Sequence, residues 1–323
     1  MKLKEFIHPE DARTLKALKN IPALPKLMEM IFQYGYDEIL WSENVTTNLR
    51  LSEKQMPEVY KLLPPICERL GMPVPELYLQ MSNIANAWTS GQSRPYIVIT
   101  LGLIKRLTPE ELEAVLAHEC GHICCHHVLY QTLANAIFSF GDSISDSLVG
   151  DLGNITMKPL RQALIAWSRA SELSADRFAC IISKPETLAY ALARIESIPR
   201  YIVRDMDISA WADQGKDYEA LKNGTMWNKI VRWMANSDAD HPYSPVRVYE
   251  AFLWAKTDLC QRLKAAPFTI EDDETEPEQK PKEKSFSENM ADKRREFADK
   301  GQELSAKGKE MLKNVGIPSF FKK

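Results

Sequence analysis

The chain has 323 residues, of which 45% are hydrophobic and 26% are charged. These proportions are those of an ordinary globular protein with a sizeable core. A formal net charge of -3 at pH 7 is too balanced to predict a nucleic-acid partner or a strongly anionic membrane as the target.

Residues 1–74 predict a helical region that packs on a larger domain. Residues 1–50 follow a helical pattern interrupted by prolines, and a second helical pattern over residues 54–70 ends at Gly71. No continuous apolar run follows the N-terminal lysines, so the sequence predicts no secretory signal.

Residues 75–267 are expected to form the main domain, which begins with a small sheet. Residues 76–81 and 95–100 are rich in β-branched and aromatic side chains and predict strands. Residues 86–91 between them are expected to form a short strand or a turn. Because the strand pattern is strong only here, we predict an α+β, mostly helical fold with a small antiparallel sheet.

A long helix is predicted from Thr108 to about Tyr130. Thr108 and Glu111 have the spacing of a capping box, and Pro109 occupies the first helical position. No stretch of the chain reaches the roughly 20 apolar residues of a membrane-spanning helix, so no span is predicted. Further helical patterns cover residues 158–182, 186–197 and 243–263.

The last part of the chain changes in character. Residues 268–286 are charged and contain few large apolar groups, which predicts a disordered linker. Residues 287–323 repeat every seven residues, but only one position per heptad is strongly apolar, whereas a coiled coil needs two. We expect an amphipathic tail that contacts a protein or, peripherally, a membrane surface. The alternative is a solvated charged tail.

The long predicted helix contains the segment HECGH, from His118 to His122. Two histidines four residues apart share one face of a helix, so both imidazoles can bind one Zn²⁺ at about 2.0–2.1 Å. Glu119 is offset by one residue and can act as general base towards a water on the metal. Gly121 is expected to let another element pack closely. The alternative is a structural histidine pair with a solvent-facing glutamate.

A catalytic zinc site with three protein ligands needs one more residue. Residues 167–179 supply Glu172 and Asp176, one turn apart on a predicted helix. We predict Glu172 as the third ligand and Asp176 as the acceptor of an N–H from a ligand histidine. For Asp176, a surface ion pair with Arg177 or Arg169 is the alternative.

Together with the late segment HPYSPVR, the motifs HECGH and SRASELSAD resemble the HtpX-like and CAAX prenyl protease family of gluzincin zinc metallopeptidases. The similarity spans about residues 75–250. It implies a zincin-like fold with the sheet beside the active-site helix. It also implies that His118, His122 and Glu172 hold one zinc ion per chain, with Glu119 as the base.

The resemblance implies roles for four further residues. His241 and Arg247 match late family residues that steady the transition-state oxyanion or the architecture of the site. For Arg247 a structural salt bridge is an equal alternative. Asn86 and Ala87 match the place where the family's edge strand faces substrate, so an extended peptide is expected to add there through backbone hydrogen bonds.

The cysteines are expected to be reduced thiols, because three of the six share one predicted helix of a large chain. Cys120 and Cys124 are expected in the core. Cys125 or His126 as an extra ligand or redox brake is a weaker alternative, and His127 is expected to pack rather than to bind metal.

We therefore predict a cytoplasmic zinc endopeptidase that hydrolyses extended or unfolded polypeptides, as in protein quality control. One alternative is a non-catalytic zinc scaffold that acts through the C-terminal tail. Another is a metal or redox sensor built on Cys120, Cys124 and Cys125. Glu119 favours the peptidase, because a structural zinc needs no base and is closed by a fourth protein ligand.

Overall fold

The structure is a computed structural model that describes residues 2–22, 24–33, 36–135, 157–196, 198–222, 244–266 and 268–271. All of them belong to one compact unit, Met1–Asp273. His241, most of the expected linker and the expected tail of residues 287–323 lie outside the described residues.

The unit is mostly helical, which confirms the predicted fold class. None of the helices within the described ranges has the length and apolar character that crossing a membrane requires. The helices are η1 (Leu3–Glu5), α1 (Pro9–Lys19), α2 (Leu24–Gln33), α3 (Tyr36–Thr47), α4 (Pro57–Tyr60), α5 (Leu63–Leu70), α6 (Leu101–Arg106), α7 (Pro109–Cys124), α9 (Met157–Ile182), α10 (Pro185–Ile195), α11 (Arg200–Val203), α12 (Ile208–Lys222), α14 (Ser244–Ala255) and α15 (Asp258–Ala265).

The small sheet is mixed rather than antiparallel throughout. In its order β1-β2-β4-β3, the central strands β2 and β4 are parallel, whereas both edge strands are antiparallel to their neighbours. The expected antiparallel pairing is therefore wrong for the central pair. Residues 81–95 carry the chain to the far side of β4 and back, which gives β4 the direction of β2. The strands are β1 (Leu49–Arg50), β2 (Glu76–Gln80), β3 (Ala87–Ser90) and β4 (Tyr96–Thr100).

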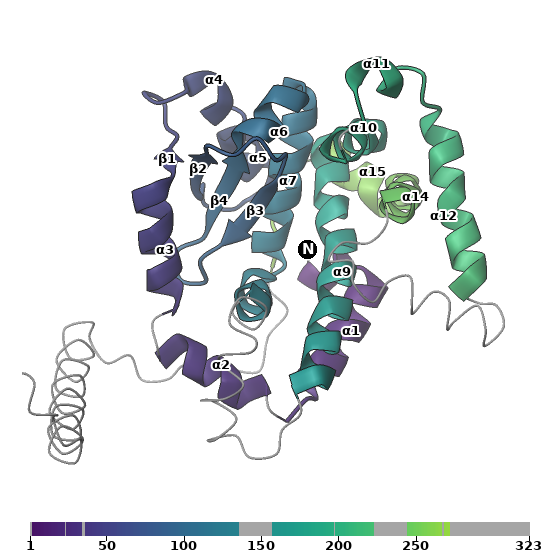
Figure 1. Cartoon of the computed structure of the whole chain (residues 1–323). Helices are drawn as coiled ribbons and strands as arrows, with labels where there is room; N and C mark the ends of the chain where they lie inside the picture. The colour runs from purple at the N-terminus through teal and green to yellow at the C-terminus, as the bar shows by residue number, and fades with distance from the viewer. Residues whose placement is uncertain are drawn as a thin grey trace, which may run out of the picture. The chain divides into compact units, whose positions relative to one another are not determined.

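Helix α7 lies between the sheet and α9 (Figure 1). The edge strand β3 contacts α7 on one side, and α9 packs along its other side. This second contact is close because Gly121 has no side chain: a Cβ there would lie 2.9 Å from the Cβ of Phe178 on α9. Gly121 thus allows the close packing predicted for it.

The predicted start of α7 is confirmed. Thr108 Oγ1 accepts the Glu111 N–H, the Glu111 carboxylate accepts the Thr108 N–H, and Pro109 is the first helical residue. The predicted end near Tyr130 is wrong, because α7 stops at Cys124 and the chain becomes helical again only at residue 128.

The end of α7 is a Schellman turn. His126 has a φ of 56°, its N–H donates to the Ile123 carbonyl, and the His127 N–H donates to the His122 carbonyl at 3.0 Å. Glycine is usual at such a left-handed position, since other residues cost roughly 1–2 kcal/mol there. The turn brings His127 back beside His122, whereas five residues of unbroken helix would place the two rings about 140° apart.

The predicted start of the disordered linker, residue 268, is too early in the sequence. The Phe268 ring lies 5.7 Å from that of Phe6, and Ile270 packs on the same core. The Leu3 N–H also donates to the Glu271 carbonyl at 2.9 Å. Residues 268–271 therefore belong to the folded unit, because these two half-buried apolar side chains pack on its core.

Candidate metal centre

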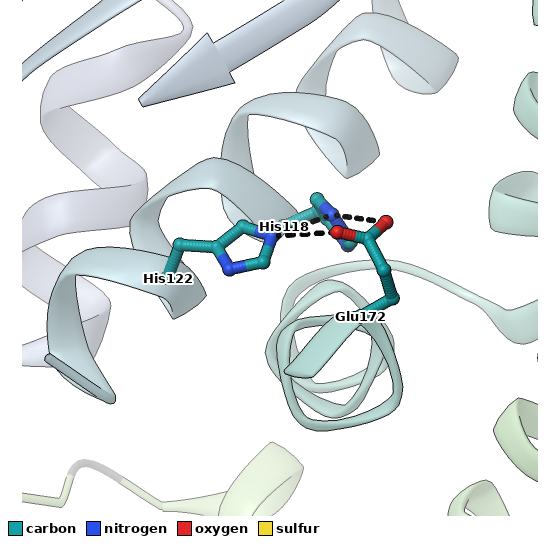
Figure 2. A group of neighbouring side chains, drawn as sticks. All are labelled: His118, His122 and Glu172. Atoms are coloured by element: carbon teal, nitrogen blue, oxygen red, sulfur yellow. Dashed lines mark hydrogen bonds and ion pairs between the residues drawn. The ribbon is translucent and has the colours of Figure 1, made fainter. Parts of the chain in front are cut away.

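Three buried side chains from two helices converge on one point. His118 and His122 lie one turn apart on α7, and Glu172 reaches them from α9 (Figure 2). His122 Nε2 lies 3.1 Å from His118 Nε2 and 3.2 Å from Glu172 Oε1. His118 Nε2 lies 3.5 Å from Glu172 Oε2.

This triangle fits a tetrahedral metal ion. Ligand atoms at about 2.0–2.2 Å from such an ion are separated by roughly 3.3 Å, close to the three distances in the structure. Two imidazole nitrogens and one carboxylate oxygen suit Zn²⁺. Within the described part of the chain, it is the one group of three or more histidine, cysteine or acidic residues whose ligand atoms meet in this way.

Asp176 and Arg247 lie directly behind the three ligand candidates. Asp176 Oδ1 is 2.9 Å from His118 Nδ1, which leaves His118 Nε2 facing the cluster. Arg247 on α14 donates from Nε to Asp176 Oδ2 at 2.8 Å and from Nη2 to Asp176 Oδ1 at 2.6 Å. Arg247 Nη1 also lies 3.0 Å from Glu172 Oε2. The guanidinium thus joins the two carboxylates of α9.

The buried charges shift the pKa values of these groups. Burial alone would lower the pKa of His118, but Glu172 and the hydrogen bond to Asp176 raise it to about 10. Burial would raise the pKa of Glu172, but Arg247 and His118 hold it well below its usual range. Without metal, both ring nitrogens of His118 are therefore protonated. A metal ion would displace the proton on Nε2, because only a neutral imidazole binds metal.

The carboxylate of Glu119 is held against the edge strand β3. Glu119 is 5% exposed, and Thr89 Oγ1 donates to its Oε2 at 2.6 Å and to its backbone carbonyl at 3.2 Å. Thr89 was not among the residues predicted from the sequence. Strand alternation is the signal that could have identified it, because it puts Thr89 on the same face of β3 as Ala87.

The substrate-facing candidates Asn86 and Ala87 lie at the start of this edge strand. Asn86 is exposed and Ala87 is half-buried. The Thr100 N–H donates to the Asn86 carbonyl at 3.0 Å, and the ladder alternation then turns the backbone groups of Ala87 and Thr89 towards the open side of the sheet. The Ala87 N–H is already bonded to Asn86 Oδ1 at 2.9 Å, so its carbonyl is the group available there.

His127 does more than pack in the core. Its ring is buried against Trp167, but His127 Nδ1 also lies 2.9 Å from His122 Nδ1. On the other side, His127 Nε2 lies 2.9 Å from Asp11 Oδ2 on α1. Two residues that the sequence analysis did not assign to the site, Asp11 and His127, therefore extend it.

The cysteines are not among the three ligand candidates. None of the six cysteines forms a disulfide, as expected for reduced thiols. Cys120 is buried with its Sγ 4.0 Å from Cys67 Sγ, and Cys124 Sγ lies 3.5 Å from Met72 Sδ. These contacts put both on the core side of α7.

Two known proteins and one solved structure are similar to this chain over different shares of its length. It is 28% identical over 257 residues to the plastoglobule-localized metallopeptidase 48, chloroplastic, of Arabidopsis thaliana, which covers 78% of this chain and 73% of that protein. It is 35% identical over 166 residues to a protease HtpX homolog of Acaryochloris marina, which covers 44% of this chain and 57% of that protein. The crystal structure of S. mikatae Ste24p aligns with a TM-score of 0.37 and 17% identity over 75% of this chain and 64% of that one.

A protein-family model also matches this chain. Peptidase family M48 matches residues 53–252, which include His118, His122, Glu172 and Arg247. This match confirms the resemblance inferred from the sequence motifs. Since it covers more than half of the chain, the protein belongs to Peptidase family M48.

Proposed function

We propose that this chain is a zinc-dependent endopeptidase that hydrolyses peptide bonds in extended or unfolded polypeptides, with Glu119 as the general base. The observation that carries the proposal is the convergence of three buried ligand atoms, with Glu119 one residue along α7. A site with three protein ligands keeps a fourth position open for water or substrate, as catalytic zinc sites do.

His118, His122 and Glu172 would hold the zinc ion, which when bound supplies a Lewis acid and an acidified water. Glu119 takes the proton of the attacking water and then gives it to the leaving amine nitrogen. Asp176 and Arg247 keep two of the ligands in place through their mutual hydrogen bonds. His241, outside the described residues, remains a predicted oxyanion donor.

The edge strand β3 supports an extended polypeptide as substrate. The outward backbone of Ala87 and Thr89 offers hydrogen bonds to another strand. Thr89 also contacts Glu119, so a peptide paired with β3 would run beside the base. Main-chain pairing requires an extended substrate but depends little on the side chains of the substrate.

The scaffold alternative has less support. A structural zinc is closed by four protein ligands, whereas the ligand group within the described residues has three. The tail on which a scaffold would rely lies outside those residues, so its contacts with protein or membrane stay predictions, as does a cytoplasmic location.

Removing the metal should abolish peptidase activity. Dialysis of the full chain against a chelator should stop cleavage of an unfolded protein such as casein, and one equivalent of Zn²⁺ should restore it. Peptide release and zinc content, measured on the same samples, check this result. Undiminished cleavage by a sample shown to contain no metal would contradict the proposal.

Replacing Thr89 with valine should lower activity about tenfold to a hundredfold, because a hydrogen bond to a charged group contributes roughly 1.5–3 kcal/mol. Valine keeps the shape of threonine but cannot donate to Glu119. Thr89→Ser keeps the hydroxyl and serves as the matched control, with most of the activity retained. Measured kcat and KM values test this, and equal kcat values for valine and threonine would rule out a positioning role.

A further inference from the structure

The N-terminal helix α1 reaches the metal centre. It lies outside the residues that match the family, yet it packs along α9, and its Asp11 is 1% exposed. The carboxylate of Asp11 contacts His127, which contacts His122 in turn. We propose that Asp11 is a positioning residue for the metal ligand His122 and that it acts through His127.

The hydrogen bonds that connect His122, His127 and Asp11 all run in one direction, from His122 towards Asp11. His122 Nε2 faces Glu172, and its other ring nitrogen points away (Figure 2). A neutral imidazole that binds metal through Nε2 carries its hydrogen on Nδ1, so His122 Nδ1 donates to His127 Nδ1. His127 then carries its own hydrogen on Nε2 and donates it to Asp11.

Asp11 is itself anchored on the helix that carries Glu172. Ser174 Oγ on α9 donates to Asp11 Oδ2 at 2.6 Å, and the His8 N–H donates to Ser174 Oγ at 2.9 Å. Burial alone would raise the pKa of Asp11, but its interactions with His127 and Ser174 hold it below its usual value. Asp11 is therefore a fixed, ionised acceptor for the hydrogen bond from His127.

The two histidine ligands are thus oriented in different ways. Asp176 contacts His118 directly, whereas Asp11 contacts His127, which in turn contacts His122. Without Asp11, His127 could carry its hydrogen on Nδ1, which would place two donors face to face and turn His122 away from the metal. Gln131 Nε2 also lies 3.1 Å from His122 Nδ1. An amide NH2 group only donates, so Gln131 can accept the hydrogen of this nitrogen only when the amide is turned to bring its oxygen to the ring.

The inference rests on the proposed metal site, and zinc affinity tests it independently of catalysis. Competition with a chelator should give an affinity about 10–100-fold weaker for Asp11→Ala than for the wild-type chain, the range found when residues behind a metal ligand are removed. Asp11→Asn keeps an oxygen that accepts from His127 and should recover part of the loss. The matched control is Leu18→Ala, which loosens the same helix by removing a fully buried side chain. Leucine is apolar and takes no part in the hydrogen bonds between Asp11, His127 and His122.

Thermal unfolding of the zinc-free variants shows whether Asp11→Ala and Leu18→Ala loosen the protein equally. Leu18→Ala should lose stability and keep wild-type zinc affinity. An equal loss of affinity in both variants would assign the effect to helix docking and overturn the inference. Equal affinity in Asp11→Ala and wild type would also overturn it, and would leave the proposed function intact. A wild-type chain that binds no zinc would overturn both.

The tautomer of His127 gives a second readout that a purely structural role would not move. Long-range ¹H–¹⁵N correlation spectra of the zinc-bound chain should show His127 with its hydrogen on Nε2. The same signals in Asp11→Ala should show a mixture of both tautomers. An unchanged spectrum in this variant would contradict the role of Asp11.

Discussion

Glu119→Gln should lower kcat about 10²–10⁴-fold, the usual contribution of a general base, and should leave one zinc ion bound per chain. Glutamine has the shape of glutamate, and its amide oxygen can still accept the hydrogen bond from Thr89 Oγ1. An amide cannot take a proton from water, so the chemical step alone should suffer. Steady-state kinetics on an unfolded polypeptide, with zinc analysis of the same sample, measure both effects.

Glu110→Gln is a suitable control, because it makes the same substitution at an exposed position of the same helix and should leave kcat unchanged. Full activity of Glu119→Gln would remove this residue as the base. A Glu119→Gln chain that lost its zinc together with its activity would show that the substitution had damaged the site rather than the chemistry.

Arg247→Leu should destabilise the zinc-free chain by about 3–5 kcal/mol, the cost of leaving buried charges unpaired. Burial alone would lower the pKa of Arg247, but the carboxylates of Asp176, Glu172 and Glu119 raise it, so the guanidinium is charged. Without this cation, carboxylates on α9 face one another in a buried site. Denaturant unfolding, with and without zinc, measures the loss. Zinc should stabilise the variant more than the wild type, because a divalent cation offsets the same negative charge.

Two further variants make this result specific. Arg262→Leu, at an exposed position of α15, should change stability by less than about 0.5 kcal/mol. Arg247→Lys keeps the charge but not the planar fork that bonds both oxygens of Asp176, and should fall between wild type and leucine. Unchanged stability of Arg247→Leu with lost activity would instead favour stabilisation of the transition-state oxyanion, one of the two roles that the family resemblance implied.

Local patterns explain what could be predicted from the sequence. Helical periodicity placed His118 and His122 on one face, and the capping box marked the start of α7, because both depend on residues three or four positions apart. The end of α7 was missed for an equally local reason: His126 adopts a left-handed conformation that usually requires glycine, and no glycine or proline marks the turn.

Other features depend on packing between distant parts of the chain. Neither strand sequence contains a sign that β2 and β4 are parallel, because the route of residues 81–95 decides it. Asp11 is 116 residues from His127, and only the packing of α1 along α9 brings them together. No periodicity or motif connects such residues, so they could be found only in the folded structure.

The hydrogen bond between Leu3 and Glu271 joins the two ends of the folded unit, so it can form only after nearly the whole unit has been translated. At about 5–20 residues per second, a ribosome needs roughly ten to fifty seconds to travel from the codon of Asp11 to that of Glu271. Helix α1 can dock once α9 has been synthesised, whereas Arg247 is translated only near the end of this interval. The HECGH segment is therefore synthesised well before Arg247, the cation that joins the two carboxylates behind the metal ligands.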